Sequence, residues 1–376
     1  MRKIFVLLLL TSLFAKKNPS IGLVLSGGGS KGFAHIEILK ALDSLNIPID
    51  YISGTSFGAI VGSMYALGYS GKQIEKMALD TDWYEVQNDE PKRKYLPFFR
   101  KKDTGKYQLK LGLDGFKPVV PTGLIYGQKI ILDLSKWTRE FEQIYDFDLL
   151  PIPFRCIAFD IISGKEVIIK EGSLSHALRA SLSLPTIFAP VEWEDQLLVD
   201  GGIINNLPVD VVKSMGADIV LAIDVTSTIT DKSRLKNIYE ILDQTLTVHG
   251  YEKKNENIKL SDYYIKPQIE EISFTDYQPE TIKKLFEMGK NAVEENIDIF
   301  KELQKLTSNK KLPPKNKEIL NKPIIDKIMI KGNKILSDNF IKSFIILKKG
   351  MKLEPSILDD SISELYSLGY FKILYY

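Results

Sequence analysis

A pentapeptide at Gly54–Gly58, with the sequence Gly-Thr-Ser-Phe-Gly, constrains the local fold of this chain more than any other short segment. It lies between an apolar segment, Ile49–Ser53, that is typical of a buried strand, and an apolar stretch that is typical of a helix. In this setting a sharp strand-to-helix turn lifts the Ser56 hydroxyl out of the sheet, and the flanking glycines allow close backbone approach. The helix N-terminus also favours developing negative charge. The pattern predicts a nucleophilic serine, with a structural Gly/Ser turn as the alternative.

A glycine loop precedes this motif. The apolar segment Ile21–Leu25 is followed by Ser-Gly-Gly-Gly-Ser-Lys-Gly at residues 26–32 and then by an expected helix. Consecutive glycines expose backbone N–H groups that can stabilise an oxyanion. A phosphate-binding loop fits less well, because Ser-Lys-Gly is not the Walker order, and a G-x-G-x-x-G pattern on Gly27, Gly29 and Gly32 lacks an isolated acidic residue at a strand end. The loop therefore favours acyl transfer.

The serine needs a proton acceptor, and the chain offers three histidines, all expected inside helices: His35, His176 and His249. An α/β-hydrolase carries its histidine on a late loop, so a Ser-His-Asp triad is disfavoured. The remaining candidate is Asp200, which ends an apolar strand and begins an Asp-Gly-Gly turn with Gly201 and Gly202. An aspartate held in this way can accept the serine proton directly. A purely structural Asp-Gly turn is the alternative.

Three motifs in this order, Gly-Gly-Gly-x-Lys-Gly, Gly-Thr-Ser-x-Gly and Asp-Gly-Gly, resemble those of the patatin-like phospholipases. The resemblance covers about Pro19 to Phe300. It implies a Ser-Asp dyad, with Ser56 as the nucleophile and Asp200 as the base, and a reaction without a metal or an organic cofactor. It also implies an oxyanion hole from the glycine loop, with a lysine in the family's basic position: Gly27, Gly28, Gly29 and Lys31.

The middle of the chain alternates between strand-like and helical segments. Buried-type strands are expected near Ile21, Ile49, Phe154, Leu197 and Ile219. This alternation predicts an α/β fold, in which a mostly parallel sheet is covered by helices on both faces. Catalytic groups of such sheets lie at the carboxyl ends of strands, where the sequence places all three motifs.

Composition narrows the range of partners and of metal chemistry. The formal net charge of +2 over 376 residues argues against a nucleic-acid partner. Cys156 is the single cysteine, which excludes an internal disulfide and a cysteine-based metal cluster. Because it falls in an apolar run, we expect a core position for it.

Residues 1–15 have the features of a secretory signal peptide. Arg2 and Lys3 precede the wholly apolar run Ile4–Leu10, and Ala15 ends a short cleavage-type sequence. The apolar run is too short to span a bilayer. We therefore expect an exported protein.

An aromatic and basic segment, Trp83–Leu113, interrupts the alternation. It combines aromatic side chains with two basic runs, Lys92–Lys94 and Arg100–Lys102. Such a composition suits an anionic lipid surface. The hypothesis is a lid or membrane-contact surface near Ser56, and the alternative is a solvated loop.

The C-terminal part is expected to form a separate module. A catalytic domain over residues 16–305 is followed by a polar, proline-containing linker at residues 306–321. The sequence of this module, residues 322–376, predicts two helices flanked by two strands. In chain order these are a strand at Ile324–Ile330, a helix from Ser337 to about Leu347, a helix from Pro355 to about Leu368, and a short strand ending at Tyr376.

This module resembles a POTRA unit, the β-α-α-β-β repeat found before outer-membrane barrels. The matching residues are the Gly332-Asn333 turn and the closing segment Leu365–Phe371. The third strand of the repeat is missing, and two strands alone form a marginal sheet. Patatin followed by POTRA resembles the patatin-like autotransporters, so we expect a fragment that lacks its barrel, or a barrel partner in the outer membrane.

These features together predict an exported serine acyl hydrolase. It would cleave glycerophospholipid esters, as a phospholipase A or lysophospholipase, through an acyl-enzyme on Ser56 with Asp200 as the base. The expected partner is a phospholipid or membrane surface, and a homo-oligomer is compatible with the sequence. The alternatives are a non-catalytic secretion or binding module and a soluble carboxylesterase for small esters.

Overall fold

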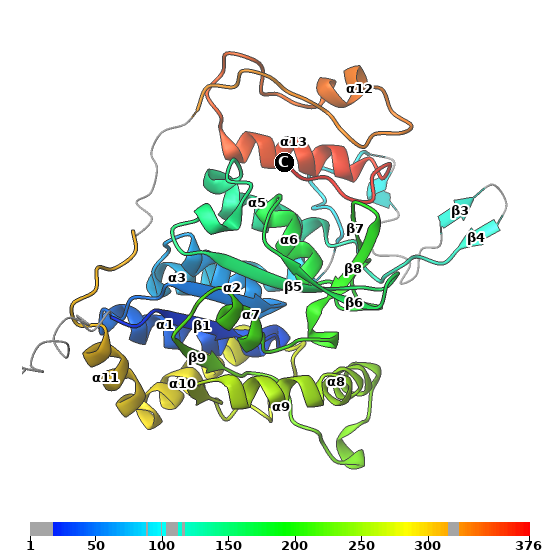
Figure 1. The fold of residues 1–376 in the computed structure, drawn as a ribbon. Coiled ribbons are helices and arrows are strands. Elements are labelled where there is room, and N and C mark those ends of the chain that lie inside the picture. Colours follow the sequence, from blue (N-terminus) through cyan, green and yellow to red (C-terminus); the bar gives the residue numbers. More distant parts are fainter. Residues whose placement is uncertain (1–17, 88, 99, 103–111, 115–116, 315–322) are drawn as a thin grey trace, which may run out of the picture.

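The computed structural model describes residues 18–87, 89–98, 100–102, 112–114, 117–314 and 323–376 (Figure 1). The expected signal peptide and residues 315–321 of the expected linker lie outside the described residues. Within the described ranges, no helix has both the length and the apolar character that are needed to cross a bilayer.

The core is an eight-stranded sheet with the order β10-β9-β1-β2-β5-β8-β7, and β6 pairs with β5 beside this path. The strands from β10 to β5 run parallel, whereas β6 and β8 run antiparallel to β5, and β7 antiparallel to β8. Their bounds are β1 Ile21–Leu25, β2 Tyr51–Thr55, β5 Phe154–Asp160, β6 Lys165–Ile169, β7 Val191–Trp193, β8 Gln196–Asp200, β9 Ile219–Ile223 and β10 Tyr263–Ile265. The predicted mostly parallel sheet is confirmed.

The central strands send alternate side chains to opposite faces of the sheet. In β1, Leu23 and Leu25 belong to the larger apolar cluster, whereas Val24 belongs to the smaller one. Helices cover both faces, as predicted: α1 (Ala34–Ser44), α2 (Phe57–Ala66) and α10 (Pro279–Glu295) contribute to the larger cluster, and α7 (Val209–Ser214) contributes to the smaller. Cys156 is a fully buried residue of the larger cluster.

The other described elements surround this core. A two-stranded hairpin, β3 (Gly112–Asp114) and β4 (Lys117–Val119), extends from one side of the molecule in Figure 1. The remaining α-helices described are α3 Gly71–Asp80, α4 Trp83–Val86, α5 Gln128–Thr138, α6 Leu174–Ser181, α8 Ile238–His249, α9 Tyr251–Leu260, α11 Ile297–Leu306, α12 Asp338–Ser343 and α13 Pro355–Ser367.

One strand begins and ends later than the sequence predicted. The segment expected as a strand at Ile49–Ser53 forms β2 at Tyr51–Thr55 instead. The difference arises because β2 stays paired with both neighbours up to the motif, with Gly54 opposite Leu25 of β1 and Thr55 opposite Ile157 of β5. The nucleophile candidate is therefore the first residue beyond the strand.

The direction of β8 differs from the simplest parallel arrangement. Although β8 is antiparallel to β5, it overlaps only the last residues of β5, and Asp200 lies opposite Ala158. Because Ile157 pairs with Thr55 of β2, Ser56 and Asp200 reach the same level of the sheet on either side of Ala158. The register therefore brings the two motifs together.

The C-terminal module forms its helices but not its strands. Ser337 caps α12, which ends at Ser343 and is shorter than predicted, and α13 agrees with the second predicted helix. Within residues 323–376 the predicted strands are absent, and Ile324 forms only an isolated bridge with Lys352. An isolated pair of strands is too small to be stable by itself, which accounts for this difference.

The module contacts the α/β domain that precedes it. The Gln128 side chain, at the start of α5, exchanges two hydrogen bonds of 2.6 and 2.7 Å with the backbone of Leu374. The His176 ring of α6 stacks between Trp193 and Tyr375. The two hydrogen bonds satisfy the backbone N–H and carbonyl of Leu374.

The basic segment that follows α4 is partly engaged by this module. Lys94 forms an ion pair with Asp360 at 3.6 Å, and Arg100 donates to the Ser367 carbonyl at 2.7 Å. Trp83, at the start of the expected lid segment, is a core residue with 6% exposure. Residues 103–111 of that segment lie outside the described ranges, so the lid hypothesis stays a prediction.

We predict that deletion of residues 322–376 changes kcat/KM for a water-soluble ester by less than about tenfold, or about 1.4 kcal/mol. The docking contacts do not include Ser56 or Asp200. Steady-state kinetics of the truncated and complete chains test this, with Gln128→Ala as a matched variant that removes only side-chain docking bonds. A larger loss with unchanged circular dichroism would show that the module is coupled to catalysis.

Candidate active site

The turn that carries Ser56 is strained in the way that a nucleophile turn requires. Ser56 has a φ of 54° and a ψ of −126°, a backbone conformation that residues other than glycine rarely adopt. The Ser56 N–H donates to the Ser181 hydroxyl at 3.0 Å, which holds the turn. A Cβ at Gly58 would collide with the carbonyl oxygens of Leu25 and Ser26, so the second motif glycine is needed for close packing on the glycine loop.

The turn brings Ser56 into direct contact with Asp200. The Ser56 hydroxyl donates to Asp200 Oδ2 at 2.6 Å, and the Gly202 N–H donates to Asp200 Oδ1 at 2.7 Å. Asp200 is 5% exposed. Burial raises the pKa of Asp200 to about 6, against the opposing effect of the two hydrogen bonds. A carboxylate with this pKa can accept a proton near neutral pH and return it readily.

None of the three histidines takes the position of a base. His35 is fully buried and contacts the Ser26 carbonyl at 2.9 Å, His176 contacts the Glu192 carbonyl at 3.3 Å, and His249 contacts the Ile203 carbonyl at 2.7 Å. Burial lowers the pKa of His35 to about 4. Each ring thus contacts a backbone carbonyl.

The glycine loop lies against Ser56, but its three donors differ. The Gly27 N–H already donates to the Asn206 side chain at 3.0 Å. Within the described ranges, the N–H groups of Gly28 and Gly29 donate no hydrogen bond. Gly29 has φ of 57°, and a Cβ there would collide with the Phe274 carbonyl. Gly28 and Gly29 are therefore the donors that remain available for an oxyanion.

Lys31 does not contribute a donor to this loop, which corrects the sequence prediction. Its ammonium donates to the Ser227 hydroxyl at 2.6 Å, and its backbone N–H donates to the Gly28 carbonyl at 3.2 Å. Lys31 is 2% exposed, and burial lowers its pKa. The side chain instead supports the segment that follows β9.

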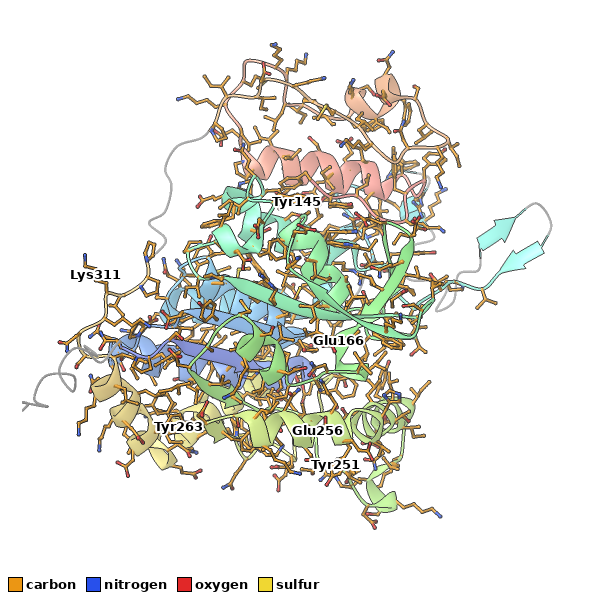
Figure 2. All side chains as sticks on the ribbon, viewed as in Figure 1. Tyr145, Glu166, Tyr251, Glu256, Tyr263 and Lys311 are labelled. Atoms are coloured by element: carbon orange, nitrogen blue, oxygen red, sulfur yellow. The ribbon has the colours of Figure 1, made fainter. Side chains whose placement is uncertain are left out.

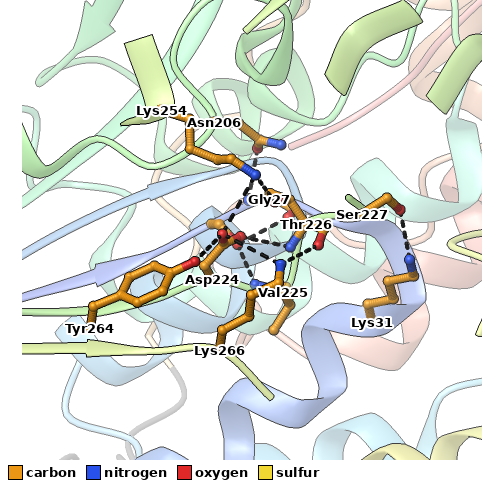
Figure 3. Close-up of polar contacts among 11 residues, drawn as sticks. Gly27, Lys31, Asn206, Asp224, Val225, Thr226, Ser227, Lys254, Tyr264 and Lys266 are labelled. Atoms are coloured by element: carbon orange, nitrogen blue, oxygen red, sulfur yellow. Dashed lines mark hydrogen bonds and ion pairs between the residues drawn. The ribbon is translucent and has the colours of Figure 1, made fainter. Parts of the chain in front are cut away.

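A charged cluster behind the glycine loop was missed by the sequence analysis (Figure 3). Asp224 is fully buried and accepts hydrogen bonds from the Tyr264 hydroxyl and the Thr226 N–H, both at 2.8 Å. Lys254 and Lys266 each lie 3.6 Å from its carboxylate. Burial favours a raised pKa for Asp224, but the two ammonium groups outweigh it, so the pKa is lowered. The available signal was a charged residue directly after a wholly apolar strand.

Val225, the residue after Asp224, contacts the glycine loop at two points. The Val225 N–H donates to the Ser26 hydroxyl at 2.8 Å, and a Cβ at Gly28 would lie 2.9 Å from the Val225 carbonyl oxygen. Residues 224–226 therefore form the support against which the glycine loop packs.

Ser56 and Asp200 open into a cavity of about 250 Å³. Apolar side chains make up much of the lining: Ile60, Trp83, Val86, Leu124, Ile125, Ile130, Leu182, Ile187 and Phe188. Arg179, 1% exposed, holds nearby loops together by donating to the Tyr126 and Ala189 carbonyls. Polar side chains also line the cavity, among them Asn206, Thr226, Ser227 and Asp243. The cavity therefore suits an amphiphilic ligand.

Within the described residues, no group of three or more His, Cys, Asp or Glu side chains is arranged to hold a metal ion.

A family model for the patatin-like phospholipases matches residues 23–213, and the chain belongs to this family. A second model, for POTRA, described as a surface antigen variable number repeat, matches residues 323–373. A POTRA repeat is therefore present at the C-terminus.

Curated relatives match a little over half of this chain. "Patatin-like phospholipase domain-containing protein 6" of Homo sapiens is 33% identical over 210 residues, 55% of this chain and 13% of that protein. "Patatin-like phospholipase domain-containing protein 7" of Rattus norvegicus is 35% identical, over 59% of this chain and 15% of that protein. An uncharacterized NTE family protein of Mycobacterium tuberculosis is 31% identical, over 55% of this chain and 49% of that protein. The chain thus spans half or less of their lengths.

Two solved structures show a distant likeness. VipD from Legionella pneumophila has a TM-score of 0.41 and 14% identity, covering 75% of this chain and 67% of that one. The ExoU–SpcU complex of Pseudomonas aeruginosa has a TM-score of 0.39 and 17% identity, covering 75% of this chain and 52% of that one.

We predict that Asp224→Asn lowers the free energy of unfolding by on the order of 3 kcal/mol, because it leaves two ammonium groups without their buried counter-charge. Urea denaturation followed by circular dichroism measures the change. The matched control is Asp326→Asn, which removes an ion pair with Lys349 whose side chains are 90% and 78% exposed. The control should cost less than about 1 kcal/mol. Equal losses in the two variants would contradict the role assigned to the cluster.

Proposed function

We propose that the chain is a lipid acyl hydrolase of the phospholipase A or lysophospholipase type that works through a Ser56–Asp200 dyad. The observation that carries the proposal is the 2.6 Å hydrogen bond from the Ser56 hydroxyl to the buried Asp200 carboxylate, both of which line a cavity with polar and apolar walls. The family membership supports it, since the matched region contains both residues.

The reaction follows from the positions of these groups. Ser56 Oγ attacks the ester carbonyl carbon while its proton passes to Asp200 Oδ2, and the Gly28 and Gly29 N–H groups stabilise the oxyanion. The ester C–O bond then breaks, and the leaving alcohol takes the proton from Asp200. Water attacks the acyl-enzyme with Asp200 again as the base. The products are a fatty acid and regenerated Ser56.

The cavity supports a lipid substrate in particular. Its apolar side chains can bury an acyl chain, with about 0.8 kcal/mol gained for each CH₂ group removed from water. Its polar part, with Asn206, Thr226 and Ser227, suits the ester and head-group end of the same molecule. A carboxylesterase for small esters is the second candidate, because the same dyad would serve it, and a non-catalytic module is the third.

The cellular setting is part of the proposal. A POTRA repeat after a patatin domain supports an exported protein of the autotransporter type, located at the outer membrane or the cell surface, with a barrel as partner or as continuation of the chain. The N-terminal signal-type sequence points the same way. Self-association into a homo-oligomer is also part of this proposal.

We expect Ser56→Ala to abolish hydrolysis, because it removes the hydroxyl that is hydrogen-bonded to the proposed base Asp200. Asp200→Asn should reduce kcat by several orders of magnitude, since an amide cannot accept the proton. Fluorophosphonate labelling and mass spectrometry of fatty acids released from defined phospholipids measure the two effects. Retained labelling in Ser56→Ala would disprove the assignment, and activity on short water-soluble esters alone would favour the carboxylesterase.

The pH dependence gives an independent test of the base. Because the reaction needs ionised Asp200, kcat/KM for a water-soluble ester should fall about tenfold per pH unit below the pKa of about 6. Single substitutions His35→Gln, His176→Gln and His249→Gln should leave this profile in place. If one of them removed the acid limb with the fold intact, a histidine base would replace the dyad.

A further inference from the structure

α8 lines the cavity with one side and exposes an apolar face on the other. None of its residues is buried, although it contains isoleucine, leucine and valine side chains. Ile238 is 68% exposed, and Ile241 and Val248 are each 52% exposed. Their spacing of three and seven residues places them on one side of the helix, which we call the α8 face. A globular protein normally turns such a stripe toward its core.

The α8 face lies opposite the side of the helix that lines the cavity. The cavity-lining residues of α8 are Tyr239, Asp243, Leu246 and Thr247. At 100° per residue these four positions point about half a turn away from Ile238, Ile241 and Val248. The helix is held in this orientation by the hydrogen bond from the Thr230 N–H to Gln244 and by the contact of His249 with the Ile203 carbonyl. Its outer face is therefore presented to the surroundings.

Basic and apolar side chains continue this surface on either side of α8. Lys232, Arg234 and Lys236 are exposed in the turn before the helix, and Ile229 is 50% exposed. Tyr251, which begins α9, is 45% exposed and lies on the outer surface in Figure 2. Leu124, which also lines the cavity, is 68% exposed. Figure 1 places α8 and the β3–β4 hairpin on the side toward which the parallel strands point.

We propose that the α8 face, together with Lys232 and Lys236, binds an anionic lipid surface and sets the cavity opening against it. A lipid that moves from a bilayer into a water-facing cavity would expose its acyl chain on the way, which the hydrophobic effect opposes. If the α8 face lies in the membrane interface, the acyl chain has less contact with water as it passes into the cavity. The flanking lysines add attraction to anionic head groups. This surface differs from the basic segment at residues 92–102, where Lys94 and Arg100 contact the C-terminal module.

The inference rests on the proposed function for its lipid ligand, but its test does not require catalysis. The complete chain carrying Ser56→Ala is sedimented with sucrose-loaded vesicles of phosphatidylcholine, with and without phosphatidylglycerol. Adding Ile238→Asn, Ile241→Asn and Val248→Asn should weaken binding to both vesicles by at least about tenfold. Adding Lys232→Gln and Lys236→Gln instead should weaken binding about tenfold only on the anionic vesicles and at low salt. The matched control is Ile335→Asn, at a side chain 90% exposed in the C-terminal module, which should change nothing.

Three results would overturn the inference: no vesicle binding by the Ser56→Ala chain, unchanged binding by the triple asparagine variant, or an equal loss in the control. A dimer that the triple variant converts to monomers, with vesicle binding unchanged, would show that the face joins two copies of the chain. In the Ser56 background the triple variant should keep its kcat/KM on a water-soluble ester. If Ser56→Ala still hydrolysed lipid, the proposed function would fail while the vesicle result would stand.

Discussion

The hydrogen bond between the Ser56 hydroxyl and the Asp200 carboxylate is the interaction on which the rest of the site depends. It forms because β8 pairs with only the last residues of β5, so that Asp200 ends opposite Ala158. A shift of this pairing by one residue would move Asp200 by about 3.3 Å and turn its side chain to the other face of the sheet. The strained backbone of Ser56 then supplies the second half of the geometry. The contact between Ser56 and Asp200 is therefore a product of strand register as much as of the two motifs.

The buried carboxylate has an energetic cost that the fold must offset. The pKa of Asp200 is raised from 3.8 to about 6 by burial, so the folded chain binds this proton more tightly than the unfolded chain does. Protonated Asp200 therefore contributes most to the free energy of unfolding below pH 3.8, and this contribution is lost as the pH rises through about 6. A shift of about two pKa units corresponds to about 3 kcal/mol at neutral pH. A carboxylate held ready to take a proton thus costs stability under the conditions in which it would work.

Much of this arrangement could be predicted from the sequence, because the signals were local. The apolar strands, the two glycine motifs and the Asp-Gly-Gly turn each depend on residues close together in the chain, and these identified the mostly parallel sheet and the positions of Ser56 and Asp200. The antiparallel β8 could not be predicted, because strand direction depends on partners in β5 that lie about 40 residues away in sequence. The roles of Asn206 and Asp224 were missed for the same reason, since each acts on the glycine loop from about 180 to 200 positions away. Lys31 shows the reverse error: its place in the motif was clear, but its side chain reaches Ser227.

Two different structures surround the cavity: the charged cluster of Asp224 on one side and the exposed helix α8 on the other. On the inner side, Asp224 and its lysines form a fixed support for the loop that would hold the oxyanion, and a buried ion cluster suits this purpose because it tolerates little displacement. On the outer side, α8 has no buried residue and only a few hydrogen bonds to the body of the protein. The side of α8 that lines the cavity carries both polar and apolar side chains. It therefore differs from the wholly apolar side that a helix usually packs against a core. The isoleucines and the valine lie on the outside, where contact with water is unfavourable for apolar side chains. Exposed apolar side chains that gather on one face are typical of an interaction site.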